Sequence, residues 1–79
     1  MNPQIIKQLI EAELPDADVI VEGNDGTHFQ ARIVSELFSG KTMLQQHQMV
    51  YKALGEKMGR EIHALSMQTY TPEEWQQQN

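Results

Sequence analysis

The chain has 79 residues, of which 39% are hydrophobic and 22% charged, so we predict one globular domain over residues 1–79 rather than a disordered segment. There is no cysteine, which excludes disulfides and a thiolate metal site built by this chain alone, and which fits the reducing cytoplasm. No apolar run approaches the ~18 residues of a membrane-spanning helix, so we expect no membrane association.

The first predicted element is an amphipathic helix that ends at Pro15. Asn2 is a capping residue, and Pro3 suits the first helical position because an N–H there would have no partner inside the helix. Five apolar residues recur at helical spacing and form one stripe, namely Ile5, Ile6, Leu9, Ile10 and Leu14.

Two strands joined by a tight turn follow the helix. Residues 17–22 are rich in β-branched types, and residues 28–35 alternate between apolar and polar types. Between the strands, Asp25 and Gly26 predict a hairpin turn, because this pair tolerates the positive φ that such turns require. The second strand places three apolar side chains on one face, namely Phe29, Ala31 and Ile33. This pattern implies a sheet that is buried on one side.

A longer helix is expected over about residues 42–58, after a connection at residues 37–40 that carries an apolar anchor. Gly55 weakens this helix, and Gly59 is the residue expected to close it. Its inner stripe is predicted to comprise Met43, His47, Val50, Leu54 and Met58.

A third strand and a short helix complete the predicted elements. Residues 62–70 alternate in the manner of a strand, and Thr71 with Pro72 begins the last helix. Residues 76–79 are expected to form a frayed tail.

The predicted order of elements is therefore α-β-β-α-β-α. A hairpin cannot bury its apolar face alone, so the two longer helices must lie across one side of the sheet. We expect an α/β (α+β) fold with a three-stranded mixed sheet and helices packed on one face.

No constellation of catalytic residues is visible. The chain lacks a cysteine nucleophile, a Gly-x-Ser-x-Gly motif, and the Walker and dinucleotide-binding glycine patterns. The adjacent acids Glu73 and Glu74 are explained better by the positive end of the last helix than by acid–base catalysis. We therefore predict that the protein is not an enzyme.

Three histidines remain as candidates for chemistry, namely His28, His47 and His63. Imidazole suits iron, zinc and copper, but spacings of 19 and 16 residues match no contiguous metal motif, and a lone histidine is more often structural. His28 and His63 lie near element ends, whereas His47 lies in the helical stripe, where we expect it to pack or to support a ligand. A metal site would need a partner, most simply two nitrogens from this chain and two sulfurs from outside, as Rieske centres show.

Charge is distributed unevenly along the chain, whose net charge is −5. Residues 11–36 contain seven acidic residues against Arg32 alone, whereas residues 41–60 contain four basic residues and one acidic residue. Two solvated faces are the simpler interpretation, and the other is a surface that docks nucleic acid or an acidic partner. The candidates for that docking are Lys41, His47, Lys52, Lys57 and Arg60.

Several segments resemble the BolA family. The matching segments are residues 28–30 (HFQ), 34–40 (VSELFSG), 44–50 (LQQHQMV), 62–65 (IHAL) and 70–75 (YTPEEW). The resemblance spans nearly the whole chain, and the short hairpin loop and acidic balance are most similar to the IbaG branch. It implies a class II KH-like fold, which agrees with the order of elements predicted above.

The resemblance also implies partnership with monothiol glutaredoxins, in iron–sulfur cluster trafficking or iron homeostasis. A two-iron, two-sulfur cluster would be bridged between the proteins, with sulfur from the glutaredoxin cysteine and from glutathione supplied by the partner. The isolated chain is then expected to bind no cofactor. The family's C-terminal histidine matches His63, the expected nitrogen ligand. In many members of the family the other ligand lies in a longer loop between the first two strands. That loop is short here and its only candidate is His28, which is therefore the second candidate ligand.

A DNA-binding transcriptional regulator of stress response or cell morphology is the alternative function. His47 matches the middle of an Arg-His-Arg segment of the family, but Gln46 and Gln48 flank it here, so two positive charges are missing. A plain protein–protein module is a third possibility, and alone we expect a monomer or weak homodimer. The discriminating feature is whether His28 and His63 lie together on an open surface.

Overall fold

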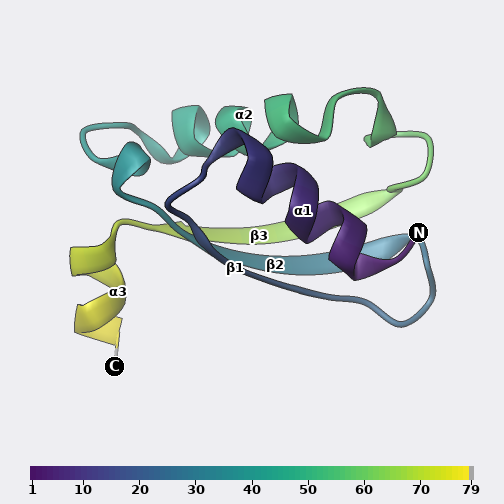
Figure 1. Cartoon of the computed structure of the whole chain (residues 1–79), viewed down its shortest axis with the longest axis horizontal. Helices are drawn as coiled ribbons and strands as arrows, with labels where there is room; N and C mark the ends of the chain where they lie inside the picture. Colours follow the sequence, from purple (N-terminus) through teal and green to yellow (C-terminus); the bar gives the residue numbers. More distant parts are fainter. Residues whose placement is uncertain (79) are drawn as a thin grey trace.

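A three-stranded sheet organises the fold, and the computed structural model describes residues 1–78 (Figure 1). The helices and strands follow the predicted order: α1 (Pro3–Glu13), β1 (Asp18–Glu22), β2 (His28–Val34), α2 (Met43–Leu54), β3 (Ala64–Tyr70) and α3 (Pro72–Gln78). Short 3-10 turns, η1 (Glu36–Phe38) and η2 (Gly55–Lys57), flank α2. Within the described residues, no helix is both long and apolar enough to cross a membrane.

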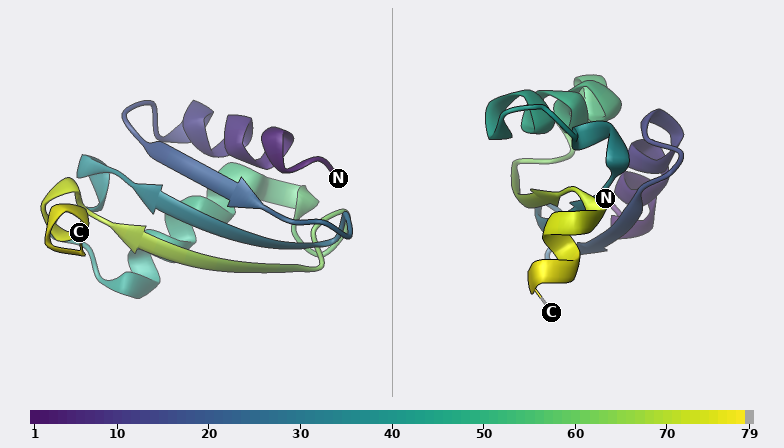
Figure 2. Two further views of the ribbon diagram at one scale, coloured as in Figure 1. Left: turned by 90° about the horizontal axis from the view of Figure 1, so that it is seen from below. Right: turned by 90° about the vertical axis from the view of Figure 1, so that its left-hand side faces the viewer.

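The sheet is mixed, as predicted, with the order β1-β2-β3. β1 pairs antiparallel with β2, and β3 pairs parallel with the other side of β2. Helices α1 and α2 lie side by side on one face of the sheet (Figure 1). Seen from the opposite side, the three strands lie in front of α2 (Figure 2, left). The sheet therefore has one face covered by the two longer helices and one face that they leave open.

The core lies between that covered face and the two helices. On β2, alternate residues point into it, and Phe29, Ala31 and Ile33 are all buried, which confirms the predicted face. The apolar anchor expected in the connection is Phe38, which is fully buried. The remaining buried apolar residues of this cluster are Ile6, Ile10, Leu14, Val19, Val50, Leu54 and Ile62.

Helix α1 forms for the local reasons that the sequence indicated. The Asn2 side chain accepts a hydrogen bond from the backbone N–H of Gln4 at 2.8 Å, and Pro3 occupies the first helical position. Ile6 and Ile10 are buried as predicted, whereas Ile5 lies at the edge of the stripe and is exposed. A side chain at the border of an apolar stripe is turned far enough round the helix to reach solvent.

Helix α2 differs from the prediction in its end and in its inner face. It ends at Leu54, because Gly55 takes φ +55° and the chain turns into η2, so closure at Gly59 was wrong. Met43, which was expected inside, is 69% exposed, and Gln46 is buried instead. Gln46 is tolerated there because its amide has partners: Nε2 donates to the carbonyls of Phe38 at 3.3 Å and Lys41 at 3.0 Å, and Oε1 accepts from Thr69 Oγ1 at 2.6 Å.

The strand boundaries are shorter than predicted at three points. β1 begins at Asp18 rather than residue 17, and β2 ends at Val34 because Ser35 caps η1. β3 begins at Ala64 rather than residue 62, because a turn closes beforehand with the Gly59 N–H donating to the Ile62 carbonyl at 2.8 Å. Each difference arises where a side-chain cap or a turn takes over the backbone hydrogen bonds.

The short helix α3 leaves the end of β3 and lies on the side of the sheet away from α1 and α2 (Figures 1 and 2). Its Trp75 ring contacts the Tyr70 ring. The Arg32 guanidinium stacks over the Trp75 ring, at 4.2 Å from the centroid of that ring. Arg32 points from the open face of β2, so this cation–π contact holds α3 against that face. The helix continues through Gln78, and the part of the predicted frayed tail at residue 79 lies outside the described residues.

A candidate metal-ligand pair at one end of the sheet

The turn between β1 and β2 is organised by the side chain of Asp25. Its Oδ1 accepts hydrogen bonds from the backbone N–H groups of Thr27 at 3.0 Å and His28 at 2.8 Å. Gly26 takes φ +82°, the conformation for which the Asp-Gly pair was predicted to be needed. The turn therefore delivers the chain into β2 with His28 as the first residue of the strand.

His28 and His63 are brought together by the parallel pairing of β2 and β3. His28 lies opposite Ala64, the residue after His63, and the backbone N–H of His63 donates to the carbonyl of Thr27 at 2.9 Å. The two imidazole rings lie edge to face, with centroids 6.4 Å apart. Both residues are exposed. The structure thus places the two predicted ligands side by side on an open surface; their role as ligands stays a prediction.

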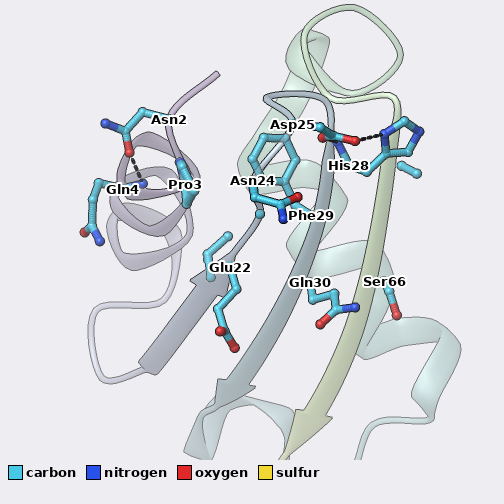
Figure 3. A pocket seen from close by; sticks show the side chains of 13 residues that line it. Asn2, Pro3, Gln4, Glu22, Asn24, Asp25, His28, Phe29, Gln30 and Ser66 are labelled. Carbon is cyan, nitrogen blue, oxygen red and sulfur yellow. Dashed lines mark hydrogen bonds and ion pairs between the residues drawn. The ribbon is translucent and has the colours of Figure 1, made fainter.

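The Asp25 carboxylate also contacts the His28 ring. Its Oδ2 lies 2.6 Å from His28 Nδ1 (Figure 3). The Thr27 hydroxyl lies 3.0 Å from the same nitrogen. The backbone N–H of Thr27, then that of His28, and then the His28 ring hold the pKa of the Asp25 carboxyl far below its ordinary value. Asp25 is therefore a fixed negative charge beside the histidine pair at neutral pH.

A pocket of about 770 Å³ lies beside His28, between the start of α1, the turn and the open face of the sheet (Figure 3). Its lining mixes polar and apolar residues, and the polar ones include Asn2, Gln4, Glu22, Gln30 and Ser66. Such a lining supplies hydrogen-bonding groups beside some apolar surface. His28, though not His63, consequently lines a concave surface that carries polar groups.

This end of the sheet offers two nitrogen donors and little else for a metal. Within residues 1–78, no group of three histidine, cysteine, aspartate or glutamate side chains is arranged to hold a metal ion. The Asp25 carboxylate is already engaged by two backbone N–H groups and the His28 ring. A complete coordination shell at the pair would need ligands from a second molecule.

His47 lies apart from this pair. It is half-buried on α2, which covers one face of the sheet, whereas His28 belongs to the outward-facing residues of β2. The sheet therefore separates the two side chains. This position favours packing for His47 over support of a ligand.

The basic residues predicted to dock a partner are partly occupied by ion pairs. Lys52 Nζ lies 3.7 Å from a carboxylate oxygen of Glu13, on α1, and Lys57 Nζ lies 3.4 Å from one of Glu61. Lys41 and Arg60 are exposed, and in the described part of the chain neither has an ion-pair partner. Docking by this set stays a prediction.

Asp25 is the residue that the sequence analysis missed, because it was counted only as a turn former. The available signal was the spacing Asp25-Gly-Thr-His28. An aspartate in such a turn accepts from backbone N–H groups two and three residues on, and this brings its second oxygen near the side chain of the later residue.

A family model described as "BolA-like protein" matches residues 4–74. The chain belongs to the BolA family. The regulator "DNA-binding transcriptional regulator BolA" of Haemophilus influenzae is 38% identical over 85 residues, which cover 96% of this chain and 82% of that protein. This match confirms the predicted family, and the IbaG branch stays a prediction.

Solved BolA structures share the fold. A BolA homologue from Coxiella burnetii is 47% identical, with a TM-score of 0.84 over 96% of this chain and 97% of that chain. Yeast Fra2 is 35% identical, with a TM-score of 0.75 over 95% of this chain and 84% of that one. These neighbours confirm the α+β fold with a three-stranded mixed sheet, and the name of the Haemophilus relative is that of a regulator rather than an enzyme.

Proposed function

We propose that this BolA-family chain is a non-enzymatic partner of a monothiol glutaredoxin, with which it shares a bridged two-iron, two-sulfur cluster. The observation that carries the proposal is the exposed pair of His28 and His63, whose ring centroids lie 6.4 Å apart. Glutaredoxin and its glutathione would supply sulfur, and this chain would supply nitrogen. His63 is the first ligand in this proposal, and His28 the second.

The spacing of the two rings suits one iron after a small adjustment. A metal held by a ring nitrogen at about 2.1 Å lies about 3 Å from the ring centroid, so two imidazoles on one metal have centroids about 5–6 Å apart. The observed separation is slightly wider, and the His63 side chain is exposed. A modest rotation of the His63 ring therefore brings both nitrogens to one site without disturbing the core.

The chemistry of the donor atoms supports sharing of a cluster with the partner rather than permanent binding of a cluster by this chain alone. Replacing thiolates on one iron by neutral imidazoles removes negative charge and raises the reduction potential of the cluster. Because the chain has no cysteine and only two clustered imidazoles at this end, it depends on the partner for the remaining ligands. Such a chain modifies a cluster that the partner already holds.

The test compares three histidine variants in the mixed complex. His63→Ala, His28→Ala and His47→Ala are each added to anaerobically reconstituted glutaredoxin that carries its cluster and glutathione, and visible circular dichroism is recorded. We expect His63→Ala to abolish the spectrum of the shared cluster and His28→Ala to alter it. His47→Ala is the comparison variant, since it removes the same side chain from α2, where its loss can weaken docking but removes no ligand. At a saturating concentration of the chain, the spectrum of the shared cluster should therefore be that of wild type.

Far-ultraviolet circular dichroism verifies that each variant is folded. His63 and His28 are exposed, so truncating either should leave the fold intact. A His63→Ala complex with an unchanged visible spectrum would remove His63 from the site.

The name of the Haemophilus relative favours DNA binding as the second candidate function. In this case Lys41 and Arg60 would contact phosphates, because Lys52 and Lys57 are engaged with acidic residues. Each phosphate contact steepens the dependence of log affinity on log salt by about 0.9. Binding to duplex DNA that weakens with salt in this way, and less steeply in Lys41→Ala, would support this function; no binding at low salt would exclude it.

A further inference from the structure

We propose that Asp25 is a positioning residue that fixes the tautomer of His28, with the proton on Nδ1 and the lone pair of Nε2 directed outward as the ligand atom. The inference rests on the proposed function and adds to it a residue that does not touch the metal. It is carried by the 2.6 Å contact between Asp25 Oδ2 and His28 Nδ1.

The direction of this hydrogen bond follows from the groups that make it. An ionised carboxylate can only accept, so in the neutral imidazole the shared proton must reside on Nδ1. The Thr27 hydroxyl, 3.0 Å from the same nitrogen, can rotate to accept or donate and so imposes no choice. His28 Nε2 is then unprotonated, which is the state that binds a metal. The contact also limits rotation of the ring.

The two carboxylate oxygens of Asp25 make different contacts. Oδ1 stabilises the turn, because it accepts hydrogen bonds from the backbone N–H groups of Thr27 and His28. Oδ2 faces the ring. The His28 side chain is 62% exposed and the Asp25 side chain 51% exposed, and contacts of a carboxylate at such exposure contribute little to stability. The backbone hydrogen bonds of the turn do not use Oδ2, so its contact with the ring is explained by orienting His28 as a ligand.

The substitution Asp25→Asn separates these roles. The asparagine oxygen can still accept from the turn amides, but its NH₂ group replaces Oδ2 and can only donate toward Nδ1. The proton of the neutral ring should then move to Nε2, where it blocks the ligand position. Asp18→Asn is the matched control, because it removes the same charge from an exposed aspartate at the far end of β1.

The first readout uses the protein without metal. Long-range ¹H–¹⁵N correlation spectra of the ring nitrogens, at a pH of about 8.5 where an ordinary imidazole is neutral, report which nitrogen carries the proton. We expect Nδ1–H in wild type and Asp18→Asn, and Nε2–H in Asp25→Asn. If wild-type His28 carries its proton on Nε2, the inference is wrong whatever the protein's function.

The second readout is the concentration of chain that half-saturates the visible circular dichroism change of cluster-loaded glutaredoxin. Substituting a residue that orients a ligating histidine typically lowers metal affinity about 10–100-fold. Asp25→Asn should therefore raise the half-saturating concentration by at least about 10-fold, and Asp18→Asn should leave it unchanged. Asp25→Ser, which keeps an acceptor for the turn amides but has no group that reaches the ring, should give an intermediate loss.

The outcomes distinguish the two proposals. No spectral change with wild-type protein would overturn the proposed function, and with it any role of Asp25 toward the cluster. A normal wild-type titration that Asp25→Asn reproduces would overturn the role of Asp25 alone. A flipped tautomer together with weakened sharing would support both.

Discussion

The buried amide of Gln46 provides a sharp test of how α2 is held to the sheet and to the preceding loop. Its side chain is 8% exposed and makes three hydrogen bonds, two to the carbonyls of Phe38 and Lys41 and one from the Thr69 hydroxyl. The substitution Gln46→Leu keeps a similar volume but removes all three bonds. We therefore expect this apolar substitution to destabilise the protein, although it places a leucine in a largely apolar surrounding.

The magnitude follows from the number of bonds. At about 1 kcal/mol of net stability per hydrogen bond, the loss is about 3 kcal/mol, and apolar burial by leucine offsets about 1 kcal/mol of it. The expected decrease in the free energy of unfolding is about 2 kcal/mol, or a fall in Tm of about 8–16 °C for a domain of this size. Thr69→Val removes one of the three bonds and should cost about 1 kcal/mol.

Urea unfolding, followed by far-ultraviolet circular dichroism, measures both substitutions and their combination. Because Gln46 and Thr69 share one hydrogen bond, the double variant should be more stable than the sum of the single losses predicts, by about 1 kcal/mol. A Gln46→Leu protein as stable as wild type, or additivity in the cycle, would refute the assignment of Gln46 as the polar link between α2, the loop and β3.

Three further substitutions test the fold and the turn. Gly55→Ala should lower the free energy of unfolding by about 1–3 kcal/mol in urea unfolding, because φ +55° with ψ −131° strains any residue with a side chain; no loss would contradict the observed helix end. Phe38→Ala should lower the free energy of unfolding by about 3–5 kcal/mol. This is a large share of the about 4–12 kcal/mol of total stability expected for a domain of this size. A Tm within a few degrees of wild type would argue against Phe38 as the anchor. Since the pKa of the Asp25 carboxyl is lowered in the folded state, its stabilisation is present above the ordinary value of 3.8 and is lost as pH falls through the folded-state pKa. The stability difference between wild type and Asp25→Asn, measured by thermal unfolding, should therefore shrink as pH falls below 3.8, and a difference that grows would contradict it.

Local chemistry predicted much of the fold. Asn2 and Pro3 determine the start of α1 through contacts within one turn, and the alternation of Phe29, Ala31 and Ile33 determines the buried face of β2. Both patterns depend only on neighbouring residues, so they are legible in the sequence. The same holds for the Asp25-Gly26 turn.

Long-range contacts account for what the sequence analysis missed. The inner face of α2 was misassigned because Gln46 is buried through partners in the η1–α2 loop and on β3, which spacing along the helix does not reveal. Likewise, the position of His28 and His63 near element ends was legible, but their proximity depends on the register of two strands separated by a whole helix. The contact of Asp25 with His28 required the geometry of the turn as well as its type.

The most direct test of cluster sharing is a titration of wild-type protein into cluster-loaded monothiol glutaredoxin with glutathione, followed by visible circular dichroism under anaerobic conditions. The exposed pair of His28 and His63 predicts a new spectrum that saturates at one chain per glutaredoxin. An unchanged spectrum, with no complex detected by size, would contradict cluster sharing and leave DNA binding as the function to pursue.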